Sequence, residues 1–321
     1  MGESGTRASW PRGHPDQGVR PTIGAESQSK RHCALSVPGA LWAGHSCRRF
    51  YAALILFSFI TAAQAATPDT LDRGYAQMYN LQFAEAHQTF HEWERLHPQD
   101  PLGPVSDAAA YLFSEFDRLH ILQSEFFTHD QHFVTDHKLT PDPLLKRDFE
   151  AAIQASRTLA ARAPNDTNAL FAALLCDGLE SDYAALIEKR YRASFQQMKA
   201  GSAAAERLLA QDPTFYDAWL AVGVENYMLS IKPAPVRWLL RLGGGQTDRA
   251  MGIEKLRLTA EKGHYLAPFA KLLLAVAAMR DHDNQRAREL LAGLIRDYPQ
   301  NPLYRQELTR MSALASRSVP Q

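Results

Sequence analysis

The sequence has little cysteine, no excess of charge of either sign and no apolar run long enough to span a bilayer. Of its 321 residues three are cysteines, and Cys176 is the only one after residue 47, which argues against an internal disulfide framework or a cysteine zinc site. Lys and Arg number 35, as do Asp and Glu, whereas nucleic-acid-binding chains usually show a basic excess. The apolar run 50–61 is short of the ~20 residues that a spanning helix needs. We therefore expect no nucleic-acid partner and no transmembrane span in the mature chain.

The apolar run has the surroundings of a secretory signal peptide. Arg48 and Arg49 precede it, and the small-residue triplet Ala63-Gln-Ala65 follows it, as at a cleavage site. We expect 48–65 to be a signal peptide that is cleaved after Ala65, and 66–321 to be the folded domain, periplasmic or secreted. Residues 1–47 are interpreted as a start codon assigned too early or as a disordered leader. Residues 1–65 contain seven of the basic and three of the acidic residues, so the remainder carries 28 and 32, a net charge of −4.

The predicted domain has the pattern of an all-α protein. Apolar residues recur at spacings of three and four, strand signals are scarce, and Ala and Leu, which favour helix, dominate. The spacing predicts five helix pairs and a short terminal helix near 302–314 that would cover the end of the stack. The pairs are 69–80 with 83–96, 105–127 with 142–162, 167–189 with 192–210, 215–230 with 247–262, and 266–281 with 284–298.

Four prolines, at positions 98, 164, 213 and 299, close helical runs in similar contexts. The pattern resembles the tetratricopeptide repeat (TPR) family, a helix–turn–helix unit of about 34 residues with small residues at fixed places and a closing proline. The intervals between these prolines are 66, 49 and 86 residues, so we expect an irregular TPR-like solenoid. The residues at the family's small, aromatic and aliphatic positions are Gly74, Ala86, Phe90, Ala152, Trp219, Gly223, Ala275, Ala287 and Leu291.

The resemblance implies a non-catalytic scaffold or adaptor that binds a protein or peptide partner in the cell envelope. Such stacks present a groove lined by the first helix of each pair, although packing inside the stack is the alternative for every residue on those helices. No cofactor and no metal are assigned. The predicted partner-binding residues are Tyr75, Tyr79, Tyr111, Glu115, Arg118, Glu180, Tyr183, Asn226, Tyr227, Arg237, Trp238 and Arg241.

Residues 226–253 carry a second, narrower resemblance, to the tetratricopeptide-39/Iml2-like proteins and their bacterial relatives. They contain a Pro-rich link, a short apolar helix, a Gly turn and an Asp-Arg pair that opens the next helix. The turn 243–245 lacks the Lys-Ser/Thr of a phosphate loop and is interpreted as a helix C-cap. The apolar helix 233–242 is either a plug packed over the fourth pair or an exposed docking patch, with a membrane contact as a third possibility.

Two other functions stay open as alternatives. One is a metal-dependent hydrolase that would use the histidine-rich segment His129–His137, the densest group of ligand-type residues. The other is a membrane-apposed subunit of an envelope transport or assembly complex. His87 and His91 lack the H-E-x-x-H pattern and are interpreted as a solvated or inter-helix face. The acidic residues Asp177, Glu180, Asp182 and Glu188 are interpreted as partners of Lys189, Arg190 and Arg192.

Overall fold

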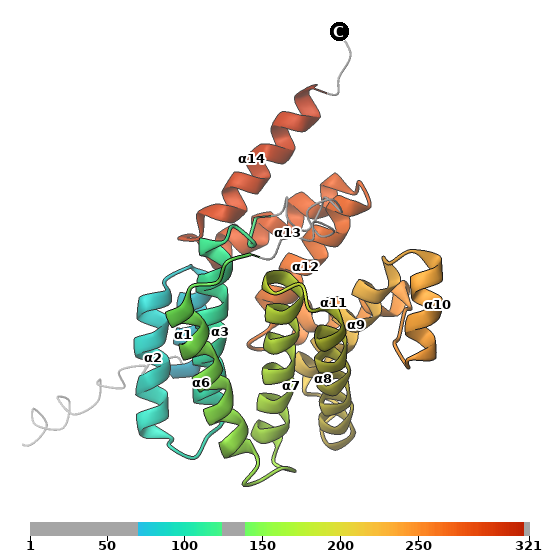
Figure 1. Cartoon of the computed structure of the whole chain (residues 1–321). Helices are drawn as coiled ribbons and strands as arrows, with labels where there is room; N and C mark the ends of the chain where they lie inside the picture. Colours follow the sequence, from blue (N-terminus) through green and yellow to red (C-terminus); the bar gives the residue numbers. More distant parts are fainter. Residues whose placement is uncertain (1–69, 124–138, 318–321) are drawn as a thin grey trace, which may run out of the picture. The chain divides into compact units, whose positions relative to one another are not determined.

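A computed structural model describes residues 70–123 and 139–317 of the chain, and its secondary structure there is α-helical without a strand (Figure 1). The signal peptide, the leader and the segment His129–His137 lie outside the described residues. The helices are α1 (Thr70–Tyr79), α2 (Phe83–Leu96), α3 (Leu102–Arg118), α6 (Pro143–Ala160), α7 (Thr167–Asp182), α8 (Tyr191–Gln211), α9 (Trp219–Ser230), α10 (Ala234–Leu242), α11 (Arg249–Lys262), α12 (Ala267–Arg280), α13 (Asn284–Asp297) and α14 (Pro302–Arg317).

The prediction of an all-α helical-hairpin solenoid is confirmed, although two helices differ from their predicted bounds. Helix α3 begins at Leu102, before the predicted 105, because Pro104 lies in its first turn, where a missing N–H costs no helical hydrogen bond. The same helix ends at Arg118, well before the predicted 127, and residues 119–123 form a turn. The predicted helix 167–189 ends at Asp182 and continues as a π-helical turn, Tyr183–Ile187. The other boundaries agree closely, since Asp142, Asp166 and Asp283 cap α6, α7 and α13 with their side chains.

Each helix of the stack packs on the next one along the chain, except at α10, where α9 packs directly on α11. Helix α10 contacts α9 and lies outside the stack, as Figure 1 shows in orange. Small residues allow the close approaches: a Cβ atom on Gly74 would collide with the ring of Phe90, and one on Gly223 would lie 3.0 Å from Leu256. Both glycines were predicted from their place in the repeat.

Helix α1 also contacts the far end of the stack, across most of the sequence. The ring of Tyr75 stacks on that of Tyr265 at 4.8 Å, and the hydroxyl of Tyr79 donates to the carbonyl of Tyr265 at 2.9 Å. The side-chain amide of Asn301 donates to the carbonyl of Tyr79, also at 2.9 Å. Helix α1 is therefore joined to the turns that precede α12 and α14, and the aromatic side chains between them belong to the core.

Candidate functional site

Most of the predicted partner-binding residues lie inside the stack rather than on a groove. Tyr111 is half-buried, with its ring 4.0 Å from that of His87. The carboxylate of Glu180 accepts from Arg157 at 2.5 Å and from Gln197 at 3.2 Å. The structure therefore leaves Trp238, Arg241 and Arg118 as the exposed members of the set. The members that are at most 5% exposed are Tyr75, Tyr79, Glu115, Tyr183, Asn226 and Tyr227.

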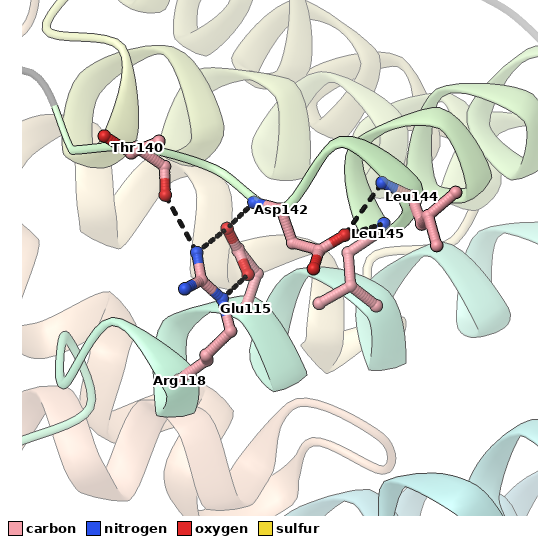
Figure 2. Close-up of polar contacts among 6 residues, drawn as sticks. All are labelled: Glu115, Arg118, Thr140, Asp142, Leu144 and Leu145. Carbon is pink, nitrogen blue, oxygen red and sulfur yellow. Dashed lines mark hydrogen bonds and ion pairs between the residues drawn. The ribbon is translucent and has the colours of Figure 1, made fainter.

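Glu115 and Arg118 hold the start of α6 against α3 (Figure 2). The buried carboxylate of Glu115 accepts the backbone N–H of Asp142 at 2.8 Å and two N–H groups of Arg118 at 2.7 and 2.8 Å. Arg118 also donates to the carbonyl of Thr140 at 2.8 Å. Asp142 in turn accepts from two backbone N–H groups of the first turn of α6, and these bonds lower its pKa. The pair of the buried Glu115 and the exposed Arg118 therefore holds the start of α6 in place.

Glu225 and Asn226 do the same at the start of α11. One oxygen of Glu225 accepts the backbone N–H of Gln246 at 3.1 Å, and the other accepts the hydroxyl of Ser202. Asn226 accepts the backbone N–H of Asp248 at 3.1 Å, and Asp248 caps α11. Both side chains are 1% exposed. They hold the end of the connection that carries α10. Glu225 was not predicted from the sequence, because its neighbours along the chain form no recognisable motif around it.

The acid at position 217 is a third example of this device. The carboxylate of Asp217 accepts the backbone N–H groups of His264, Tyr265 and Leu266 at 2.9 to 3.1 Å. Burial raises its pKa, and the three hydrogen bonds oppose that rise. A buried acidic side chain thus fixes the start of α6, of α11 and of α12, and α10 is attached to a rigid support.

The glycine turn after α10 has the geometry predicted for it. Gly244 has φ +80°, the left-handed region that glycine adopts without strain. The N–H groups of Gly243 and Gly245 donate to the carbonyls of Leu239 and Leu240, at 3.2 and 2.8 Å, which ends the helix. A Cβ atom on Gly245 would lie 2.9 Å from a methyl of Leu229, so the turn packs closely on α9.

Helix α10 presents most of its apolar side chains to solvent, and its two arginines donate hydrogen bonds to the segments on either side of the helix. The Arg237 guanidinium donates at 3.4 Å to the carbonyl of Ser230, the last residue of α9, and at 2.9 Å to the carbonyl of Lys232 in the link that follows. Arg241 donates to the hydroxyl of Thr247 at 2.5 Å. The interpretation of this helix as a plug is therefore wrong: no residue of α10 is buried. We call the following residues, with their exposed fractions, the α10 face: Val236 (43%), Trp238 (65%), Leu239 (64%) and Leu242 (67%).

Three of the four acidic residues predicted to pair with cations do form ion pairs, mostly with partners other than those predicted. The prediction is wrong for Asp182, which has no ion pair among the described residues and whose pKa is raised by burial. Arg157 on α6 bonds to Asp177 at 2.7 Å and to Glu180, while Lys146 of α6 bonds to Glu188 at 2.8 Å. Of the predicted partners, Arg190 pairs with Glu188 at 3.1 Å. The partners come from α6 because that helix packs along α7, a contact that spacing within α7 does not reveal.

A second polar cluster consists of residue types that commonly bind metal ions. Among the described residues, the side chains of His91, Glu94 and Asp107 bring their potential metal-ligand atoms within 4.8 Å of one another. Cys176, which is fully buried with its thiol pKa raised by burial to about 12, lies apart from it and is inert, as expected.

The chain matches no protein-family model, no curated protein and no solved structure. Among the helices that the structure describes, none combines the length and the apolar content required to cross a bilayer. The candidate functional features of this chain are therefore the α10 face, the buried residues that hold the connection carrying α10, and the cluster of His91, Glu94 and Asp107.

Proposed function

We propose that this chain is an exported, non-catalytic TPR-like scaffold that docks on a protein partner of the cell envelope through the α10 face. The observation that carries the proposal is the exposure of four large apolar side chains on one helix of nine residues. Exposed apolar surface that is concentrated in one place commonly marks an interaction site. Trp238 at its centre is of the residue type that most often dominates binding energy at interfaces.

The support of α10 suits a docking role. The link to α9 contains Pro233, which restricts the backbone, and Arg237 fixes the helix to carbonyls of the last residue of α9 and of the link. The turn that follows is held by Glu225 through Gln246. A surface that is already fixed in its bound arrangement loses less conformational entropy on association. The apolar side chains are thus displayed by a rigid platform.

The charge around α10 indicates the chemistry of the partner. Residues 227–247 contain no Asp or Glu, and they include three cations, Lys232, Arg237 and Arg241. We expect the partner to offer an apolar pocket rimmed by carboxylates, since complementary charge steers association and selects partners. A protein is favoured over a lipid surface because α10 carries only two cations, Arg237 and Arg241, whereas helices that lie on a membrane are rich in Lys and Arg on their polar face.

Site-specific photo-crosslinking in cells that produce the protein tests the proposal. A crosslinking amino acid at Leu239 should give one defined protein adduct that disappears when Trp238→Asp is added. The matched control is a crosslinker at Leu144 on α6, an apolar side chain that is 61% exposed and should give no such adduct. Equal adducts from both positions, or an adduct at Leu239 that is unchanged by Trp238→Asp, would contradict the proposal.

Vesicle flotation separates the membrane-apposed alternative. Purified chain mixed with vesicles that contain anionic lipid should remain in the unbound fraction. Flotation that is lost with Leu239→Asp and Leu242→Asp would assign the α10 face to a lipid surface and refute a protein partner as its occupant.

A further inference from the structure

A buried carboxylate lies between two histidines where α2 meets α3. The Nδ1 atom of His87 is 2.6 Å from one oxygen of Asp107, and the Nε2 atom of His91 is 3.1 Å from the other. The Asp107 side chain is 5% exposed. The two histidines are four residues apart on α2, so they share one face of that helix, and Asp107 reaches them from α3.

A second carboxylate faces the same point. Glu94 follows His91 by three residues on α2, and the ligand atoms of His91, Glu94 and Asp107 all lie within 4.8 Å of one another. Burial and the negative charge of Asp107 raise the pKa of Glu94. In the described ranges, the salt bridges of Asp107 are with the two histidines, and no Lys or Arg pairs with Glu94. The arrangement thus brings two carboxylates together with histidines, and without a Lys or Arg, to compensate their charge.

We infer that His91, Glu94 and Asp107 form a binding site for a divalent transition-metal cation, of which Zn²⁺ fits best. One imidazole nitrogen and two carboxylate oxygens suit zinc, whereas Mg²⁺ and Ca²⁺ prefer oxygen ligands alone. Three protein ligands leave a fourth position for water or for a ligand atom from another molecule. Metal–ligand distances of about 2 Å place tetrahedral ligand atoms about 3.3 Å apart, so ligand atoms that now lie within 4.8 Å of one another would draw together around the ion.

His87 is a positioning residue for this site. Its Nδ1–H can donate to the Asp107 oxygen that faces away from His91, which fixes the orientation of the carboxylate, as outer-shell partners of metal ligands do. Tyr111 packs against the His87 ring and limits the freedom of the imidazole. A bound cation would join α2 to α3, and so the first hairpin to the second, independently of whatever binds to the α10 face.

Zinc titration of the full chain tests the inference. The chain, carrying no histidine tag and stripped with a chelator, is titrated with ZnCl₂ by calorimetry at about pH 7.5, and its melting is followed in parallel. A concentration about a hundredfold above the dissociation constant should raise Tm by about 5–10 °C. MgCl₂ should give no such rise. His91→Ala and Glu94→Gln should each weaken binding about tenfold or more, and His87→Ala should weaken it by a smaller factor.

Two control variants locate the metal. Glu85→Gln changes an exposed carboxylate on the same helix and should bind zinc as the unchanged chain does. The double variant His129→Ala, His132→Ala replaces two histidines of the segment His129–His137 and should also bind zinc as the unchanged chain does. Co²⁺ bound in place of zinc should give ligand-field absorption without the sulfur charge-transfer band that cysteine ligands produce.

Clear outcomes would overturn the inference. A folded chain that zinc does not stabilise would leave the cluster as a hydrogen-bonded pair of histidines around an aspartate. Zinc binding that survives both His91→Ala and Glu94→Gln, with circular dichroism showing folded variants, would place the metal elsewhere. Binding that does not weaken between about pH 7.5 and 5.5 would exclude a histidine ligand, because protonated imidazole cannot bind metal.

Discussion

Gly252 on α11 lies directly against the backbone of Tyr227 on α9: a Cβ atom added to the glycine would be 2.6 Å from the Tyr227 nitrogen. The backbone of a packed helix cannot give way as the end of a flexible side chain can. This contact fixes how closely α9 and α11 approach, and these are the two helices that the connection carrying α10 joins. The identity of one small residue therefore controls both the packing of this pair and the support of the proposed docking helix.

Gly252→Ala should therefore destabilise the chain by about 1–3 kcal/mol through overpacking. The matched control is Gly178→Ala, an exposed glycine inside α7 whose added Cβ would meet nothing within 4 Å. That variant should gain about 0.5–1 kcal/mol, because alanine favours helix over glycine. Urea unfolding followed by circular dichroism measures both. Equal effects of the same sign would show that α9 and α11 do not approach as described.

Glu115→Gln should destabilise the chain by about 1–3 kcal/mol. The neutral amide loses the charge-assisted bonds to Arg118 and has only one oxygen to accept from Asp142. Glu254→Gln is the control, because that side chain is 67% exposed and pairs with its neighbour Lys255 alone among the described residues, and it should change stability by less than about 0.5 kcal/mol. A Glu115 variant as stable as this control would refute its role in holding α6.

The helices of this chain could be predicted from the sequence because their signals are local. The bounds of α6 follow from Asp142, which caps the first turn, and from Pro143 directly after it. The closing prolines and the three- and four-residue spacing predicted most other bounds, although not the end of α3 at Arg118. The contacts that decide which side chains are free are long-range, as between Tyr75 and Tyr265, and no local pattern encodes them.

The candidate functional features also depend partly on local sequence patterns, which could be predicted, and partly on contacts between distant helices, which could not. The spacing of His87 and His91 was visible, but the carboxylate that joins them comes from another helix. The sequence of α10 showed which residues are apolar and which are cationic, but it did not show which of them face the solvent. Their direction is decided by the carbonyls of Ser230 and Lys232, which accept from Arg237, and by Thr247, which accepts from Arg241. Those acceptors can be identified only once the helices are placed.

Trp238→Asp should leave the folded chain as stable as before, within about 0.5 kcal/mol, because the indole is 65% exposed. Phe90→Ala is the contrast: the ring is fully buried, so its loss should cost about 3–5 kcal/mol. Both are measured by urea unfolding. A strong destabilisation by Trp238→Asp would mean that the indole packs on the stack, and the α10 face would no longer be a free surface.

The raised pKa of Asp182 should make the free energy of unfolding decrease as pH rises. Asp182 ends α7 next to the π-helical turn, and burial raises its pKa from 3.8 to about 7. The folded chain therefore binds the proton more tightly than the unfolded chain does. The stabilisation this provides is complete below about pH 4 and is lost as pH rises towards 7 and beyond.

Asp182→Asn removes this titration, and the variant isolates its effect from the other carboxylates of the chain. The difference in unfolding free energy between the variant and the unchanged chain should shift in favour of the variant by about 1–3 kcal/mol between about pH 4 and pH 8, within the ~1.4 kcal/mol per pKa unit that linkage allows. Asp148→Asn, on the partly exposed face of α6, is the control and should show no such trend with pH. If the difference for Asp182→Asn is flat across this range, the carboxyl of Asp182 titrates near its ordinary pKa and is solvated in the folded chain.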